Sequence, residues 1–237
     1  MENQIVRDEG RRLFIARGAA VVAAAALMKP AAWVPPPVLA QMSGADITAM
    51  EELMREHGVL SRMLLICDRI VSKLGSNGTA VSPEVTGETV EVIASYVQEY
   101  HEKLEEKFVF PPMRERMPEL VQVLTRQHAA GRVHINRIRR LAEEQVMDSP
   151  QNRASIIASL RGFIAMYRPH KAREDTVLFP AFRAMLSPAE LEELAGIFRK
   201  EEKSLGVEDD FESVVERVEK LEKELGIFDL SRFTQAM

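Results

Sequence analysis

One pattern of histidine, glutamate and proline occurs twice in the sequence and constrains the fold more than any other feature. Residues 101–105 read His-Glu-Lys-Leu-Glu, residues 170–174 read His-Lys-Ala-Arg-Glu, and a Phe-Pro follows each copy with its proline ten residues after the histidine. A further histidine precedes each copy, His57 by 44 residues and His128 by 42. Four of the five histidines therefore share one arrangement, His…His-x-x-x-Glu.

This duplicated pattern predicts a dinuclear metal site. Residues four apart lie on the same face of a helix, so each copy presents an imidazole and a carboxylate to one point. A single His-x-x-x-Glu is more simply explained as a surface pair. Two copies with matching offsets are not explained by chance surface pairs and favour metal binding. If the two glutamates face the core, they need a partner there, because charged side chains are seldom buried unless they are paired or bound to metal. The predicted ligands are His57, His101, Glu105, His128, His170 and Glu174.

Composition sets limits on the fold and the function. With 237 residues, of which 46% are apolar, the chain can bury one substantial core. The net charge of −5, mixed charges and few aromatic residues give no support to nucleic-acid binding. Cys67 is the single cysteine, so no intramolecular disulfide or thiolate metal cage can form. Any metal must be held by nitrogen and oxygen, and Cys67 is expected to be a small core residue.

The first 40 residues are typical of an export signal rather than of a fold. Residues 10–15 read Gly-Arg-Arg-Leu-Phe-Ile, an apolar run covers 18–28, and Val-Leu-Ala at 38–40 offers a cleavage site. This resembles a twin-arginine signal, with Gly10 departing from the usual Ser or Thr. The alternative is a membrane anchor, but eleven weakly apolar residues are too few to cross roughly 30 Å of hydrocarbon. We expect the export machinery as a partner, a periplasmic location, and no integral membrane span after signal removal.

Apolar residues recur every three or four positions over four long stretches, which is the periodicity of amphipathic helices. The stretches cover about 46–74, 82–110, 118–145 and 152–179. Four long helices with short connections predict an all-α fold, an up-down-up-down four-helix bundle. The repeat of residues 57–111 in 128–180 indicates a duplicated two-helix unit, which would bring both sets of ligands to a common centre.

Prolines and polar residues predict where some helices begin and end. Ser82 followed by Pro83 is a typical helix start, and Pro111 with Pro112 should end that helix. Pro169 should kink the fourth helix. Two more helices are expected, one from Ser187 and one over about 209–225, the latter packing on the bundle or on a second subunit of a homo-oligomer. The bundle with this extension is expected to span 46–225.

The ligand pattern resembles the hemerythrin-like family, whose domain is named for a His-His-Glu cation-binding motif. The resemblance covers about 46–224. It implies a non-haem di-iron site in which the four histidines bind iron and Glu105 and Glu174 bridge the two ions, usually with an oxo or hydroxo group between them. Imidazole and carboxylate ligands by themselves would also suit manganese or zinc.

Two departures from the oxygen-carrying hemerythrins bear on function. Those carriers place a second histidine four residues after the third-helix ligand, where this chain has Arg132. They also use an aspartate five residues after the fourth-helix histidine, whereas the candidate ligand here is Glu174, four residues after it, although Asp175 stands at the carriers' spacing. The pattern is more similar to relatives linked to nitric oxide, peroxide or iron-centre chemistry. We therefore expect a periplasmic protein that binds or senses O₂, NO or peroxide. The alternatives are a di-iron enzyme that reduces peroxide or NO, and an iron storage or delivery protein.

The roles of a few residues near the pattern stay open at this point. His134 lies six positions after His128 and points roughly 120° away from it on a helix. Gly131 lies on the ligand face, where it leaves room for a small molecule or for close helix packing. Tyr167 lies three residues before the fourth-helix ligand and could donate to a bridging group or simply fill the core. Asp175 follows Glu174 directly.

Overall fold

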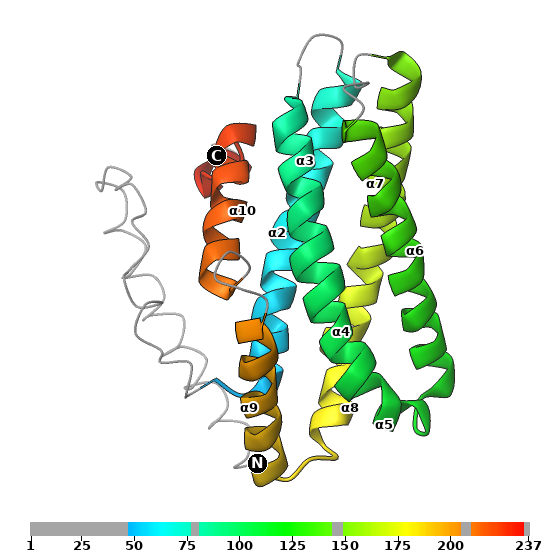
Figure 1. Ribbon diagram of the computed structural model, residues 1–237, viewed down its shortest axis with the longest axis vertical. Coiled ribbons are helices and arrows are strands. Elements are labelled where there is room, and N and C mark those ends of the chain that lie inside the picture. Colours follow the sequence, from blue (N-terminus) through cyan, green and yellow to red (C-terminus); the bar gives the residue numbers. More distant parts are fainter. Residues whose placement is uncertain (1–46, 77–80, 144–148, 205–209, 235–237) are drawn as a thin grey trace, which may run out of the picture. The chain divides into compact units, whose positions relative to one another are not determined.

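A computed structural model describes residues 47–76, 81–143, 149–204 and 210–234 (Figure 1). Within these ranges the regular structure is entirely helical and includes no strand, as predicted. None of the described helices is long and apolar enough to cross a membrane. The predicted export signal, residues 1–40, lies outside the described ranges.

Four long helical rods stand side by side and form the predicted bundle (Figure 1). Three short connections join the four rods in sequence, and each rod packs against two others. The rods are α2 (Ala49–Gly75), a second rod made of α3 (Pro83–Val92), α4 (Glu102–Leu104) and α5 (Phe110–Arg114), then α6 (Pro118–Glu143), and last α7 (Pro150–Arg173) with α8 (Phe179–Arg183).

Capping residues determine where these rods begin. Thr48 and Glu51 form a capping box at the start of α2, in which each side chain accepts from the other residue's backbone N–H. The Ser82 hydroxyl accepts from the Val85 N–H, and Pro83 occupies the first helical position, which confirms the predicted start.

The second rod does not end at Pro111 and Pro112, so the predicted helix end there was wrong. An α-helical turn would press the Pro111 ring against the carbonyl of Lys107. The chain avoids this with a wider π-helical turn over Glu105–Val109, in which the Phe110 N–H bonds to the carbonyl five residues back. The rod then continues through α5 to Arg114.

The same device occurs at the second Phe-Pro. A π-helical turn over Glu174–Leu178 precedes α8, and the Phe179 N–H bonds to the carbonyl of Glu174. The fourth rod therefore passes its proline and ends at Arg183 rather than at Phe179. A longer π-helical segment, Ile93–His101, joins α3 to α4. Pro169 lies inside α7, which stays helical around it; the kink expected there stays a prediction.

Two more helices, α9 (Pro188–Ser204) and α10 (Phe211–Leu225), follow the bundle, and a short 3-10 helix covers Leu230–Phe233. α9 packs on α2, and α10 packs on α2 and α3. The apolar face of α10 is buried against them, and Arg62 of α2 donates to both oxygens of Glu222 at 2.9 and 2.7 Å. Of the two alternatives for this helix, the structure shows packing on the bundle.

Candidate metal centre

The structure brings all six predicted ligands together in the interior of the bundle. Every rod contributes, and no ligand is more than 3% exposed. The ligands are His57 of α2, His101 and Glu105 of the second rod, His128 of α6, His170 of α7, and Glu174 at the start of the last π-helical turn.

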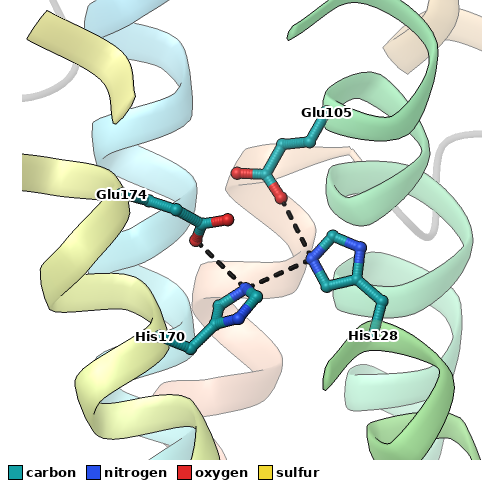
Figure 2. Close-up of side chains that lie close together, drawn as sticks. All are labelled: Glu105, His128, His170 and Glu174. Atoms are coloured by element: carbon teal, nitrogen blue, oxygen red, sulfur yellow. Dashed lines mark hydrogen bonds and ion pairs between the residues drawn. The ribbon is translucent and has the colours of Figure 1, made fainter. Parts of the chain in front are cut away.

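The Glu105 carboxylate lies between the two repeated halves of the site. One oxygen is 3.8 Å from His57 Nε2 and 3.6 Å from His101 Nε2, both in the first half. The other oxygen is 3.4 Å from His128 Nε2 in the second half (Figure 2). One carboxylate can therefore serve two metal positions.

The Glu174 carboxylate also reaches both halves. Its Oε2 is 3.1 Å from His170 Nε2 and 3.6 Å from His57 Nε2. The Nε2 atoms of His128 and His170 approach each other to 3.2 Å, and Figure 2 shows both rings aimed at the space beside the two carboxylates. The site is thus a ring of inward-facing imidazole nitrogens around two acidic side chains.

Hydrogen bonds on the far side of each ring hold the first-half histidines in this orientation. His57 Nδ1 lies 2.5 Å from Asp175, and His101 Nδ1 lies 2.7 Å from Glu56. Because a carboxylate accepts, each Nδ1 donates, which leaves Nε2 as the nitrogen available to a metal.

The second half repeats this arrangement. His128 Nδ1 lies 3.1 Å from Glu106, and His170 Nδ1 lies 2.9 Å from the Gln127 Oε1. The partners stand at equivalent places in the repeat, since Glu56 and Gln127 directly precede the lone histidines, and Glu106 and Asp175 directly follow the glutamate ligands. Sequence reasoning missed three of these four residues, although their positions beside the ligands were a usable signal.

Buried atoms without partners test whether these residues fit a metal. Both oxygens of Glu105, both oxygens of Glu174 and Nε2 of His57 have no hydrogen-bond partner within the described structure. Buried polar atoms are normally satisfied, and an unpaired buried carboxylate is costly. Oxygen and imidazole nitrogen donors of this kind suit divalent first-row metals, so the residues fit a metal site.

Burial acts to lower the pKa of all four imidazoles. At His101 and His128 the nearby carboxylates, Glu105 among them, outweigh burial and raise the pKa to about 9 and about 10. At His57 and His170 burial prevails, and the pKa is lowered to about 4. Without metal, the site therefore carries two cationic and two neutral imidazoles at neutral pH.

The two glutamates respond to their surroundings in opposite directions. Burial and the neighbouring Glu105 carboxylate raise the pKa of Glu174 well above its ordinary value. Burial also acts to raise the pKa of Glu105, but His101 and His128 outweigh it and hold that pKa low. Without metal, protons on His101, His128 and Glu174 reduce the net negative charge of the buried carboxylates.

The Phe-Pro motifs contribute to the site through their phenylalanines. Phe110 stacks on His128 at 5.2 Å between ring centroids, and Phe179 stacks on His57 at 5.1 Å. Each copy therefore covers the lone histidine of the other half, and the π-helical turn before each proline sets the position of that ring. Turns of this kind occur often at functional sites.

Tyr167 was predicted either to fill the core or to donate to a bridging group. It is buried in the core, as one of these alternatives predicted, and its hydroxyl donates to Glu102. Arg132 Nη2 lies 2.7 Å from both Glu102 and Glu106, so the arginine offsets the charge of the buried Glu102 and of the partly exposed Glu106 beside the second half. A Cβ on Gly131 would lie 2.7 Å from Cε2 of the Tyr167 ring, which shows that this glycine allows close packing.

Two further residues lie away from the centre, as the sequence indicated. His134 packs at the contact between α6 and α7, where a Cβ on Gly162 would lie 2.7 Å from its ring. Cys67 is fully buried in the core, and burial raises the pKa of its thiol to about 12.

Comparison with known proteins agrees with this geometry. The chain is 38% identical over 190 residues to uncharacterized proteins of Mycobacterium bovis (Mb2018) and Mycobacterium tuberculosis (Rv1995), covering 79% of this chain and 74% of each relative. No solved structure matches the chain significantly. The family model described as the hemerythrin HHE cation binding domain matches residues 48–182, which include all six candidate ligands. The chain therefore belongs to the hemerythrin HHE cation-binding family.

Proposed function

We propose that this protein holds two iron ions at the centre of the bundle and uses them to bind or sense O₂ or a related small molecule such as NO or peroxide. The observation that carries the proposal is the set of buried, unpartnered carboxylate oxygens facing inward-directed imidazole nitrogens. The proposed ligands are His57, His101, Glu105, His128, His170 and Glu174, with both glutamates bridging.

Two overlapping groups of donor atoms support a pair of ions rather than one. His57, His101 and Glu105 offer atoms that all lie within 4.8 Å of one another. The donor atoms of a second group also lie within 4.8 Å of one another, and this group consists of Glu105, His128, His170 and Glu174. Because Glu105 belongs to both groups, two adjacent positions share one carboxylate.

Closure of the site supports a ligand of only a few atoms. All six residues are at most 3% exposed, so a larger substrate could not reach them without rearrangement of the bundle. Iron, when bound, would supply open coordination positions and electrons for such a molecule. Arg132 occupies the place of the additional histidine of the oxygen carriers, and its pairing with Glu102 and Glu106 removes it from the ligand set. This difference from the oxygen carriers supports NO or peroxide, as well as O₂, as the molecule that the site binds.

The first test is metal content. We would purify the full chain from iron-supplied cells and measure metals per chain for the wild type and for Glu105→Ala and Glu174→Ala. His134→Ala is the matched control, since it removes the one histidine that lies away from the centre. We expect about two irons in the wild type and the control, and strong loss in both glutamate variants. Unchanged iron in those two variants would contradict the assignment.

The second test separates the candidate functions. Visible spectra of the reduced protein would be recorded before and after O₂, NO or peroxide is added. A reversible band supports a binding protein. Catalytic consumption of peroxide or NO with an electron donor would instead establish the redox enzyme, and iron contents that vary freely above two per chain would indicate storage.

We also propose that residues 1–40 direct export to the periplasm by the twin-arginine route, on the strength of Arg11 and Arg12 and the apolar run that follows. Replacement of both arginines by lysine should retain the protein in the cytoplasm in a fractionation experiment. Export of that variant at the wild-type level would refute this part of the proposal.

A further inference from the structure

The duplication allows the two halves of the site to be compared residue by residue. The lone histidines, His57 and His128, are 71 residues apart, and the residues that precede them are Glu56 and Gln127. Glu56 accepts from His101 Nδ1 at 2.7 Å in the first half, and Gln127 accepts from His170 Nδ1 at 2.9 Å in the second. The contact is therefore equivalent, but the acceptor is a carboxylate in one half and an uncharged amide in the other.

The remaining imidazole partners do not differ in this way. Asp175 accepts from His57 and also pairs with Lys171 at 2.6 Å. Glu106 accepts from His128 and also pairs with Arg132 at 2.7 Å. In both halves this contact is a carboxylate that also pairs with cations, Lys171 in the first half and Arg132 with Lys103 in the second, so the kind of acceptor is the same.

One further carboxylate lies near the second half. Glu102 Oε2 is 4.0 Å from His128 Nδ1, which is beyond hydrogen-bond distance. Arg132 lies 2.7 Å from the same oxygen and offsets its charge. Among the four Nδ1 partners, Gln127 is therefore the one uncharged acceptor, and this is the difference between the halves that the inference uses.

We propose that the two metal positions are inequivalent: the position formed by His57 and His101 binds its ion more tightly, and the position formed by His128 and His170 fills last and exchanges first. The inference rests on the proposed dinuclear site. A carboxylate on Nδ1 increases the electron donation of the imidazole more than an amide does, and partners of this kind typically change metal affinity by about 10–100-fold.

Repulsion between two bound ions would also make the second ion bind more weakly, so the positions must be measured separately. His128→Ala leaves the first position intact, and His57→Ala leaves the second. Each variant would be titrated with Co²⁺ against a chromophoric chelator, and anaerobically with Fe²⁺. We expect the ion in His128→Ala to be bound about 10–100-fold more tightly than the ion in His57→Ala.

Exchange of the two acceptors tests the cause. The double variant with Glu56→Gln and His128→Ala should bind its metal ion only as tightly as His57→Ala does. Gln127→Glu, added to His57→Ala, should raise the affinity by a similar factor. Circular dichroism would verify that every variant is folded. If a half-site variant fails to fold, the same exchanges are made with all six ligands present, where each should narrow the gap between the two binding steps.

Equal affinities in the two half-site variants, or a gap that Glu56→Gln leaves unchanged, would overturn this inference. Two ions bound by the wild type in that case would leave the proposed function standing. Failure of the wild type to bind any metal would instead overturn the proposed function itself, so the two failures are distinguishable.

Discussion

Glu174→Gln should have opposite effects on stability with and without metal. The Glu174 carboxylate is completely buried, and neither oxygen has a hydrogen-bond partner in the described part of the chain. Its raised pKa means that the folded state holds the proton more tightly than the unfolded state. Stability is therefore lost as pH rises above the unfolded carboxyl pKa of about 4.3. Glutamine keeps the shape of the protonated acid and removes this loss.

An unsatisfied buried polar group costs about 1–3 kcal/mol, and more when it is charged. The glutamine amide is also a buried polar group, but it stays neutral at pH 7, so it avoids the added cost that ionisation or proton uptake imposes on Glu174. We therefore expect metal-free Glu174→Gln at pH 7 to be more stable than the wild type by at least about 1 kcal/mol, or roughly 2–4 °C in Tm. The advantage should shrink as pH falls toward 4.5. With metal at about 100 times Kd, the wild type gains about 2.7 kcal/mol per ion, and the variant should lose most of that gain.

The assay is thermal and urea unfolding of chelator-treated and metal-loaded protein, at several pH values. Glu222→Gln is the matched control, because Glu222 is also a buried glutamate but is paired with Arg62 on both oxygens. That variant should lose about 1 kcal/mol with or without metal. If Glu174→Gln behaves like Glu222→Gln, losing stability in both forms and keeping the full response to metal, the reasoning is refuted.

Two other predictions concern packing and protons. Gly131→Ala should destabilise the metal-free protein by about 1 kcal/mol, because crowding against Tyr167 outweighs the gain in helix propensity, whereas Gly58→Ala, with nothing within 4 Å of its new Cβ, should stabilise it by about 0.5–1 kcal/mol. Urea unfolding would check the two signs, and two effects of the same sign would count against this account. Metal binding at pH 7 should displace protons from His101 and His128, whose pKa values are about 9 and about 10, and from Glu174, whose pKa is raised, so affinity should rise with pH. Calorimetry in buffers of different ionisation enthalpy would detect this release, and its absence would show that these three groups hold no proton to displace.

The candidate ligands could be predicted because their signal is local and repeated. The spacing of His101 and Glu105 places both on one helix face whatever the rest of the chain does. The second copy, His170 and Glu174, makes chance an inadequate explanation. The bundle followed from four amphipathic stretches and their short connections, which leave few ways to bury the apolar faces.

The helix ends at the Phe-Pro motifs could not be predicted in the same way. A proline removes one donor and normally stops a helix, so Pro111 predicted an end. The structure instead widens the preceding turn and continues, since the packing of Phe110 on His128 helps to hold the rod in place. Contacts from another helix here outweigh a local preference.

The hydrogen-bond partners of the imidazoles show most clearly where sequence reasoning ends. Asp175 reaches His57 across 118 residues, and Glu56 reaches His101 across 45. The partner of the Tyr167 hydroxyl is Glu102, which the sequence did not indicate.

The sequence by itself determined which residues share a helix face, and so the ligand types, their duplication and the bundle. Only the tertiary structure decided which residue supports each imidazole, where the second and fourth rods widen into π-helical turns, and that the two halves differ in a carboxylate and an amide at equivalent contacts. The physical reason is that spacing along a helix is a property of the local chain. Contacts between helices depend instead on the rotation and depth of packing of each rod, which only the whole core sets.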